Sequence, residues 1–469
     1  MAERFESEVR VSRDFDVIVI GAGAAGLSAA VAAADSGATV LLIDADTQVG
    51  GSSRLSGGHF YAADTSLQAE CGVDDSADAM FEHYMTLNQW LVQPGVVRRY
   101  CDLSGPTFEW LRSFGVRFPR EGLYPSGVGS TPRGHQPEGA GEAVVQALDA
   151  ACAERGVDLL LNARVDTLLQ EDGRVCGVQV NGDRARAGAV VVATGGFGAN
   201  DALLDQHYPA ASRGGEWRWY IGSPHAQGDG LRLGAEAGAG IDGHNRGLLL
   251  VTPGFSRDLE VLLPPWLILV NQRGARFANE QAPYTVLAGL LDHQGGPVHA
   301  VFDEAARRQA ARAPGSQAYW VDDVLERKAE EGRIVRADSL AELALAMGVP
   351  ADALDGTVAR YNQGCAEGED HDFLKPMARA MKIVEPPFYA VEVRPNVVCW
   401  TGTGLRIDPD AQVLSEQHRV VAGLFAAGET VGSLHGDRYI GGGGSFGPCI
   451  VFGKLAGENA ARFAMGQND

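Results

Sequence analysis

The first regular pattern in the chain is a short apolar run, Phe15–Ile20, that ends at Gly21. A β-branched run of this length is typical of a strand that is buried on both faces of a parallel sheet. An alanine-rich segment follows as far as Ser36, with Gly37 as its expected C-terminal cap, and a second apolar run covers 39–43. This order predicts a strand–helix–strand unit with parallel strands.

The same patterns predict a helix over 139–155, a closing helix over 446–462, and strands over 158–165, 176–180, 189–193 and 424–427. The stretch 244–400 differs, because it has proline breaks, few glycine-rich turns and amphipathic segments at 339–348 and 351–367. We therefore predict a nucleotide-binding domain made of 1–243 and 401–469, with a second domain inserted between these two parts.

Length and charge limit the possible functions. A chain of 469 residues exceeds the roughly 250–300 residues at which a single core stops growing, which favours two domains. The 39 Lys and Arg against 60 Asp and Glu leave a net charge of −21, which repels phosphate backbones and anionic lipid. We therefore expect neither nucleic acid nor a membrane as a partner.

Targeting and cysteine signals favour a cytoplasmic protein. The most apolar stretch, around 261–270, is broken by Pro264 and Pro265 and is too short to span a membrane, and residues 1–6 lack an apolar signal core. The seven cysteines form no CxxC pair, so no sequence-local zinc or iron–sulfur site is expected and no metal ligands are predicted. The 61 glycines suggest that backbone approaches another group closely at several places.

A dinucleotide motif stands where the first predicted strand ends. Gly21, Gly23 and Gly26 form a G-x-G-x-x-G pattern that opens the first helix, and Asp44 ends the next strand. In this motif the first glycine allows a tight turn, the second admits the pyrophosphate, and the third lets helix and strand pack closely. The helix N-terminus offers free N–H groups to the phosphates, and Asp44 is expected to bind the ribose hydroxyls.

Three further segments indicate FAD in place of NAD. Small and hydroxyl residues follow directly at 50–58, and two later strands end in small residues at 191–196 and 426–429. Together with the first motif, they form a four-part pattern for an extended cofactor. The predicted FAD contacts are Gly21, Gly23, Ala24, Ala25, Gly26, Asp44, Ala45, Gly51, Ser52, Ser53, Ser56, Gly57, Gly58, Val165, Ala193, Thr194, Gly195, Gly428, Glu429, Gly444 and Ser445.

On these motifs, the chain resembles the flavoprotein family of fumarate reductases, succinate dehydrogenases and 3-ketosteroid dehydrogenases. The resemblance covers essentially the whole chain, including the 228–230 turn, the Asn279-Glu280 segment and the glycine run 441–444. It implies an α/β fold with a Rossmann-like FAD-binding domain and an inserted α+β capping domain, with the active site between cap and flavin. Membrane-bound members attach FAD through a histidine where this chain has Gly51, so non-covalent FAD is expected.

The resemblance also indicates what the substrate is not. Fumarate reductases have a proton-donating arginine where this chain has Tyr284, a carboxylate-binding arginine at Tyr439, and a carboxylate-binding histidine at Trp400. A dicarboxylate needs charge-assisted pairs, and burying it without them costs several kcal/mol. Arg438 adjoins Tyr439, but neighbouring side chains usually diverge. The substrate is therefore expected to be neutral near the reacting bond.

Similar tyrosines occur in the 3-ketosteroid dehydrogenases, which remove two hydrogens beside a ketone. By this resemblance, Tyr439 and the N–H of Gly443 stabilise the carbonyl oxygen as it gains charge. Tyr284 then removes the α proton, and the β hydrogen leaves as hydride to flavin N5. A third tyrosine supports the base in some relatives, and Tyr124 is the candidate here.

Other positions leave the substrate ring open. Gly441 replaces the serine of the branch that forms the 4,5-double bond, and Ile440 and Gly442 replace the proline of the branch that forms the 1,2-double bond. A 3-oxosteroid and a smaller alicyclic ketone both fit. His135 is a candidate for the substrate entrance and His225 for the flavin, although a structural role is favoured for both.

These observations predict an FAD-dependent α,β-dehydrogenation of a cyclic ketone, with an unidentified electron acceptor. One alternative is an ene-type or fumarate-type reductase that runs the same chemistry in the opposite direction. The other is an electron-transfer flavoprotein without substrate chemistry, against which the combination of Tyr284, Tyr439 and Gly443 argues.

Overall fold

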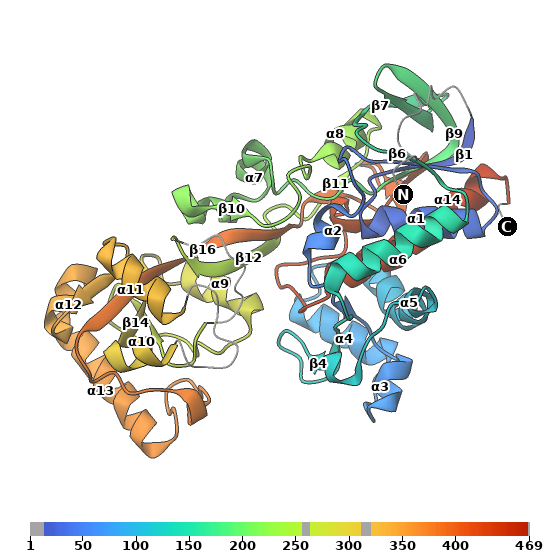
Figure 1. The fold of residues 1–469 in the computed structure, drawn as a ribbon. Helices are drawn as coiled ribbons and strands as arrows, with labels where there is room; N and C mark the ends of the chain where they lie inside the picture. The colour runs from blue at the N-terminus through green and yellow to red at the C-terminus, as the bar shows by residue number, and fades with distance from the viewer. Residues whose placement is uncertain (1–13, 256–262, 311–319, 468–469) are drawn as a thin grey trace. The chain divides into compact units, whose positions relative to one another are not determined.

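A computed structural model describes residues 14–255, 263–310 and 320–467 (Figure 1). The N-terminal segment 1–6 and the beginning of the apolar stretch 261–270 lie outside the described residues. The chain divides into two compact units. The first unit comprises 1–209, 222–248 and 399–469, and the second comprises 210–221 and 249–398. The assignment of 244–400 as a capping domain concerns function and stays a prediction.

A mostly parallel sheet is the centre of the first unit. Its parallel strands lie in the order β19 (Val420–Ala426), β9 (Asp183–Val192), β1 (Phe15–Ile20), β2 (Val40–Ile43) and β6 (Asp158–Leu160). β18 (Gln412–Leu414) adds an antiparallel edge strand to β19. All four residues of β2 are buried, as expected for a strand that is covered on both faces. The predicted strand–helix–strand unit is confirmed.

One predicted strand, 158–165, is wrong as a single element. It is split between β6 and the start of β7 (Val165–Glu171), because Asn162 adopts a left-handed φ of 55° that turns the chain. β7, β8 (Arg174–Val180) and β9 then form an antiparallel meander. Within the described part of the chain, the whole sheet has eight strands.

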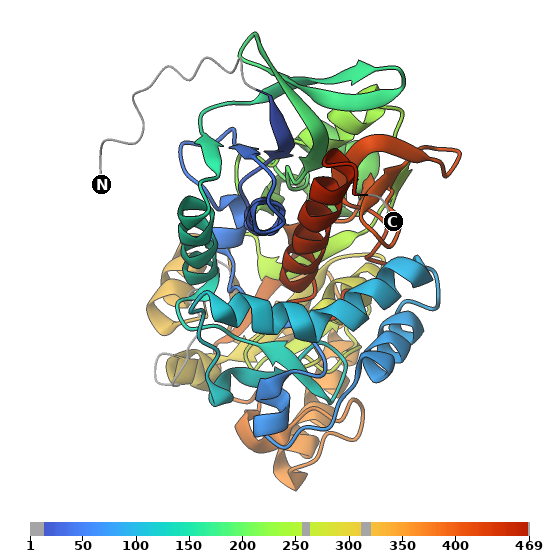
Figure 2. The ribbon, with the colours of Figure 1, turned by 90° about the vertical axis from the view of Figure 1, so that its right-hand side faces the viewer.

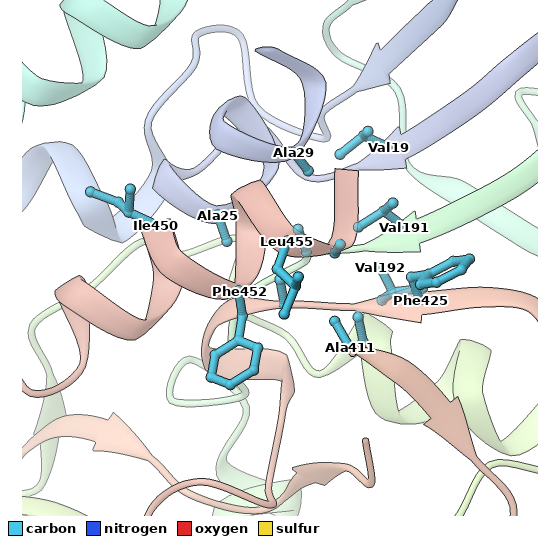
Figure 3. Close-up of a cluster of buried hydrophobic side chains, with 14 of the residues drawn as sticks. Val19, Ala25, Ala29, Val191, Val192, Ala411, Phe425, Ile450, Phe452 and Leu455 are labelled. Carbon is cyan, nitrogen blue, oxygen red and sulfur yellow. The ribbon is translucent and has the colours of Figure 1, made fainter. Parts of the chain in front are cut away.

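Two helices that are far apart in the sequence lie side by side on this sheet: α1 (Ala24–Asp35) and α14 (Phe446–Ala464) (Figure 2). Gly37 follows the cap residue of α1 with a φ of 90°, and a pair of backbone hydrogen bonds closes the helix end there. Side chains of α1 and α14 pack with those of β1, β9 and β19 in one apolar cluster (Figure 3).

Glycines allow the two helices to approach this closely. A Cβ added to Gly453 would lie 2.3 Å from the carbonyl oxygen of Ala25, and one on Gly457 would lie 2.1 Å from that of Ala29. These distances are far shorter than van der Waals contact, so the helices can approach this closely only where both positions of α14 are glycine. The position of α14 relative to α1 is therefore set by backbone contact.

The remaining elements of the first unit surround this core. Its other helices are α2 (Gly51–Leu55), α3 (Ser66–Glu70), α4 (Ala77–Leu87), α5 (Pro94–Ser113), α6 (Ala140–Glu154), α7 (Asp201–His207) and α8 (Asp229–Glu236). Two small sheets are made of β3 (Phe60–Tyr61), β5 (Pro132–His135) and β4 (Leu123–Pro125), and of β11 (Ile241–Asp242) and β17 (Gly404–Leu405).

The second unit is built on a mixed sheet around the long strand β16. Its strands are β10 (Trp219–Tyr220), β16 (Phe388–Thr401), β14 (Val298–Asp303), β13 (Ile268–Asn271), β12 (Gly247–Pro253) and β15 (Val335–Ala337). Its helices are α9 (Tyr284–Asp292), α10 (Glu304–Ala310), α11 (Asp322–Glu330), α12 (Leu340–Met347) and α13 (Ala351–Glu367). α12 and α13 confirm the two predicted amphipathic segments.

A buried ion cluster holds the Asn279-Glu280 segment within the second unit. Glu280 accepts two hydrogen bonds of 2.8 Å from Arg276 and lies 3.0 Å from Lys375 Nζ, and Arg276 also pairs with Asp370 at 2.8 Å. The side chains of Glu280 and Lys375 are both fully buried. Burial opposes ionisation, but the two cations outweigh it and hold the pKa of Glu280 below its usual value. Two cations thus balance two carboxylates.

The glycine contact between α1 and α14 yields a matched test. We expect Gly457→Ala to destabilise the protein by about 1–3 kcal/mol, because the added methyl group cannot fit against Ala29. Gly356→Ala in α13 is the control, because an added Cβ there meets nothing within 4 Å and alanine favours the helix by about 1 kcal/mol. Thermal unfolding measures both variants, and equal melting temperatures for the two would contradict the packing argument.

Candidate active site

The three glycines of the dinucleotide motif have different structural roles. Gly21 has a φ of 102°, and its added Cβ would lie 2.3 Å from the carbonyl oxygen of Ala193. A Cβ on Gly26 would lie 1.7 Å from the carbonyl oxygen of Gly21. On Gly23 it would meet only Ser53 Oγ at 3.6 Å and a carbonyl oxygen at 3.8 Å. The fold thus requires Gly21 and Gly26, whereas Gly23 leaves space open beside the loop.

That space belongs to a hollow of about 850 Å³ in the first unit, at the ends of β1, β2 and β9. The structure brings most of the predicted cofactor residues together here: Gly21, Gly23, Ala24, Ala25, Asp44, Ala45, Gly51, Ser52, Ser53, Val165, Ala193, Thr194, Gly195, Gly428 and Glu429. We call this space the first hollow.

Other predicted cofactor residues lie outside the first hollow. Ser56 Oγ donates to the carbonyl oxygen of Ser53 at 2.7 Å and accepts from the N–H of Gly58 at 3.1 Å. Added Cβ atoms on Gly57, Gly58 and Gly444 would collide with neighbouring protein atoms, as one on Gly26 would. These residues therefore serve packing, and their cofactor contacts stay a prediction.

The first hollow also includes residues that the sequence analysis did not select as contacts. They are Ile20, Ile43, Ala163, Arg164, Ser223, His225, Ala226, Asp229, Leu233 and Cys449. Arg164 adjoins the selected Val165, and Asp229 stands in the glycine turn that supported the family resemblance, so both had a signal. His225 was considered for the flavin; it lines the hollow, with Nε2 3.8 Å from Asp46 Oδ1.

The polar groups of the first hollow fit an FAD molecule. Asp44 accepts backbone N–H groups of Ala22 at 2.5 Å and Asp46 at 2.7 Å, which directs its carboxyl to the end of β2. Burial raises the pKa of Asp44, although these two hydrogen bonds oppose the shift. Thr194 Oγ1 is buried and has no hydrogen-bond partner among the described residues. An orphaned hydroxyl and an open position at Gly23, beside the N-terminus of α1, suit a bound dinucleotide.

A second, smaller hollow shares Gly428 and Glu429 with the first. Its other lining residues are Trp400, Val431, Leu434, His435, Ser445, Pro448 and Phe452. Glu429 accepts hydrogen bonds from the N–H and the hydroxyl of Thr401 at 2.9 and 2.7 Å, and burial raises its pKa to about 7. Gly428 and Glu429 therefore line both the first hollow, beside the dinucleotide loop, and the second hollow, beside the start of α14.

Tyr439 precedes α14 in the chain, and its phenol reaches Ser445, the cap residue of that helix. Its phenol oxygen accepts the backbone N–H of Ser445 at 2.9 Å and lies 2.9 Å from Ser445 Oγ. Its ring centroid lies 6.4 Å from that of Trp400 and 6.3 Å from that of His435. Burial raises the pKa of Tyr439 well above its usual value, so the phenol is neutral and able to donate its proton in a hydrogen bond.

Among the described residues that line the second hollow, none is an arginine or a lysine. Arg246 donates to Asp437 and to the carbonyl oxygens of His435 and Leu91, so protein acceptors already occupy its guanidinium. Arg438 is exposed, and its guanidinium donates to the carbonyl oxygen of Asp437. The described lining of this hollow therefore carries no guanidinium or ammonium group, and the predicted loss of the carboxylate-binding cations stays a prediction.

The other candidate residues lie as follows. Tyr284 is the first residue of α9 in the second unit, half-buried after Pro283, and its role stays a prediction. In the first unit, Tyr124 hydrogen-bonds His59 Nδ1, and a Cβ on Gly442 would lie 2.5 Å from its phenol oxygen. Tyr124 thus adjoins the glycine run 441–444.

Gly443 and His135 occupy well-defined places in the first unit. Gly443 has a φ of 92°, and an added Cβ would lie 2.6 Å from the nitrogen of Tyr61, so the backbone conformation requires glycine. His135 is buried, with Nε2 2.9 Å from Thr65 Oγ1 and Nδ1 2.9 Å from the carbonyl oxygen of Arg133. Both of its ring nitrogens therefore have protein partners, which fits the structural interpretation.

Within the ranges that the structure describes, no helix has both the length and the apolar character needed to cross a bilayer.

Comparison with known proteins places this geometry in a family. The FAD binding domain family matches residues 16–445. A fumarate reductase (cytochrome) of Shewanella frigidimarina is 33% identical over 468 residues, which cover 96% of this chain and 77% of the relative. A 4-oxocyclohexanecarboxylate 2-dehydrogenase of Sinomonas cyclohexanicum is 29% identical over 566 residues, covering 97% of this chain and 94% of the relative.

A solved structure extends the likeness to three dimensions. The 3-ketosteroid Δ4-(5α)-dehydrogenase of Rhodococcus jostii RHA1 superposes with a TM-score of 0.80 at 28% identity, covering 97% of this chain and 98% of that one. The predicted α/β fold class is therefore confirmed. The chain belongs to the FAD binding domain family of flavoprotein oxidoreductases, which includes fumarate reductases and 3-oxosteroid dehydrogenases, and its cofactor is FAD.

Proposed function

We propose that the protein dehydrogenates a cyclic ketone between the carbons α and β to the carbonyl group. The observation that supports this most is the neutral phenol of Tyr439 at the start of α14, beside a hollow whose described lining holds no arginine or lysine. FAD, when bound, supplies the acceptor for the hydride that leaves the β carbon.

The charge of the site argues against a dicarboxylate substrate. Fumarate or succinate carries two negative charges, and burying each without a cationic partner costs several kcal/mol. Trp400 and His435 supply rings at the second hollow, and burial lowers the pKa of His435 to about 3, which keeps it uncharged. A ketone has no charge to compensate, so this surface suits it better.

The proposed reaction uses three groups of this chain. Tyr439 donates its hydroxyl hydrogen to the carbonyl oxygen, and it is polarised for this because its own oxygen accepts the N–H of Ser445. The N–H of Gly443 is the second donor to that oxygen. Tyr284, as the phenolate, accepts the α proton and becomes a neutral phenol, and the α C–H electron pair forms the new double bond as the β hydride leaves. Bound FAD would take up that hydride with its two electrons.

We propose a monocyclic ketone or a 3-oxosteroid as the substrate. The relative named 4-oxocyclohexanecarboxylate 2-dehydrogenase supports the smaller ring, and the superposed 3-ketosteroid dehydrogenase supports the larger. Gly441, Ile440 and Gly442 match neither steroid branch, which favours the monocyclic class.

The reverse reaction, reduction of an activated alkene, is the second candidate. The fumarate reductase relative, which has the higher sequence identity of the two, supports this direction. The same groups serve both directions by microscopic reversibility, so the electron partner decides between them.

Removal of the Tyr439 hydroxyl tests the proposed chemistry. In an anaerobic titration of the FAD-loaded protein, we expect a cyclohexanone or a 3-oxosteroid to bleach the flavin and succinate to leave it unchanged. Tyr439→Phe should slow the bleaching by about 10²–10³-fold, because one oxyanion donor is lost. Tyr389→Phe is the control, since that phenol bonds Glu304 at 2.7 Å within the second unit. Bleaching by succinate alone would refute the ketone proposal.

The direction of the reaction, dehydrogenation or reduction, is tested separately. Dithionite-reduced protein is mixed anaerobically with a cyclic enone or with fumarate, and flavin reoxidation is followed by absorbance. Reoxidation by either alkene, together with no bleaching by any saturated ketone, would assign the protein as a reductase.

The open position at Gly23 tests the cofactor site separately. We expect Gly23→Ala to fold normally, because an added Cβ meets protein atoms only at ordinary contact distances, but to lose most of its FAD. The ratio of flavin to protein absorbance measures loading, and the melting temperature of the apoprotein checks the fold. Wild-type FAD loading in this variant would contradict the site.

A further inference from the structure

His435 lines the second hollow but has no part in the chemistry described so far. Its residue is 7% exposed, and its ring lies edge-on to Trp400 with centroids 4.2 Å apart. The ring is nearly parallel to that of Tyr439, at an interplanar angle of 27°. His435 is thus held between the two aromatic residues that replace the carboxylate-binding groups of fumarate reductases.

A buried tyrosine contacts one ring nitrogen of His435. Tyr84 on α4 is 1% exposed, and its phenol oxygen lies 3.1 Å from His435 Nδ1 and 3.4 Å from the carbonyl oxygen of Leu434. The nearer acceptor is Nδ1. Burial raises the pKa of Tyr84, so the phenol keeps its proton and can donate it to Nδ1 or to the carbonyl oxygen of Leu434. A neutral ring has one N–H, which lies on Nε2 when Nδ1 accepts the proton of Tyr84.

Hydrogen bonds also fix the backbone around His435. Arg246 donates to the carbonyl oxygen of His435 at 3.3 Å. Asn88 donates to the carbonyl oxygen of Tyr84 at 3.2 Å and accepts the N–H of Arg438 at 3.0 Å. A Cβ on Gly436 would lie 2.2 Å from Asn88 Oδ1, so the loop is packed tightly against that side chain. The ring is therefore preorganised.

We infer that His435 is a substrate-binding residue whose Nε2–H donates to the oxygen of the ketone in the second hollow, and that Tyr84 is the positioning residue that keeps the proton on Nε2. Among the described residues, Nδ1 of His435 has Tyr84 as its partner and Nε2 has no hydrogen bond. The inference rests on the proposed function and adds a specificity determinant to it.

A neutral N–H suits a ketone better than a carboxylate. An imidazolium at this place would attract a negative charge, whereas a neutral imidazole stabilises the partial charge that a carbonyl oxygen gains during α-proton removal. The mutual packing of Tyr84, His435 and Trp400 thus favours ketones over the dicarboxylates that related enzymes bind.

The test measures binding without turnover. The FAD-loaded protein is titrated with 4-chlorophenol, whose phenolate oxygen resembles the oxygen of an enolate, and the perturbed flavin spectrum gives Kd. We expect His435→Leu to raise Kd at least about tenfold, because a hydrogen bond to a charged group is lost. His435→Gln should stay within about threefold of the wild type, since its amide nitrogen occupies the place of Nε2, whereas His435→Asn, whose amide reaches only the place of Nδ1, should resemble His435→Leu.

Tyr84→Phe tests the positioning role. Its Kd should rise by an intermediate factor and its kcat for a ketone should fall with little change in FAD loading, because the proton then divides between the two nitrogens. His207→Leu is the matched control, since that half-buried histidine lies outside both hollows, and it should bind the phenol normally.

Two results would overturn the inference: wild-type phenol affinity in His435→Leu, or equal losses in His435→Gln and His435→Asn. A shifted flavin reduction potential with unchanged phenol affinity would place the histidine against the flavin and overturn it as well. If phenol binding depends on His435 as expected but no ketone bleaches the flavin, the donor stands and the proposed dehydrogenation fails.

Discussion

Close backbone contact between α1 and α14 is the constraint on which the site depends. Gly453 and Gly457 meet the carbonyl oxygens of Ala25 and Ala29, and no side chain fits between the helices. α1 begins at the first hollow, and Ser445 at the start of α14 lines the second. The glycine contacts therefore fix the distance between two helix N-termini, and with it the positions at which a phosphate and a reacting group are stabilised.

The two hollows differ in chemistry, and this difference follows from the side chains at their ends. The first is lined by small residues, hydroxyls and Asp44, which suit the phosphates and ribose of a dinucleotide. The second lies beside two rings that burial keeps neutral, those of His435 and Tyr439. His435 Nδ1 forms a hydrogen bond with Tyr84, and the phenol oxygen of Tyr439 accepts the N–H of Ser445. A site of neutral, oriented donors stabilises developing charge without first binding a charged substrate.

The relatives show that one fold occurs in enzymes with different substrates. The fumarate reductase relative and the 4-oxocyclohexanecarboxylate 2-dehydrogenase relative both align over nearly the whole of this chain. Proteins named for different substrates therefore share one fold, so individual side chains and not the fold decide the substrate. In the proposed function, the side chains of this chain that make the difference are Trp400, Tyr439 and Tyr284.

The local elements and the cofactor motif could be predicted from the sequence, because short-range periodicity and glycine spacing report on them directly. β1, α1, β2, α12 and α13 follow from apolar patterns, and Asp44 follows from its place at a strand end. The break at Asn162 could not be predicted, since a left-handed residue has no periodic signal. Only tertiary structure brought Ser223, Leu233 and Cys449 to the first hollow and paired Tyr84 with His435, 351 residues later. Such contacts arise from packing between distant segments, and no pattern of neighbouring residues encodes which of them will meet.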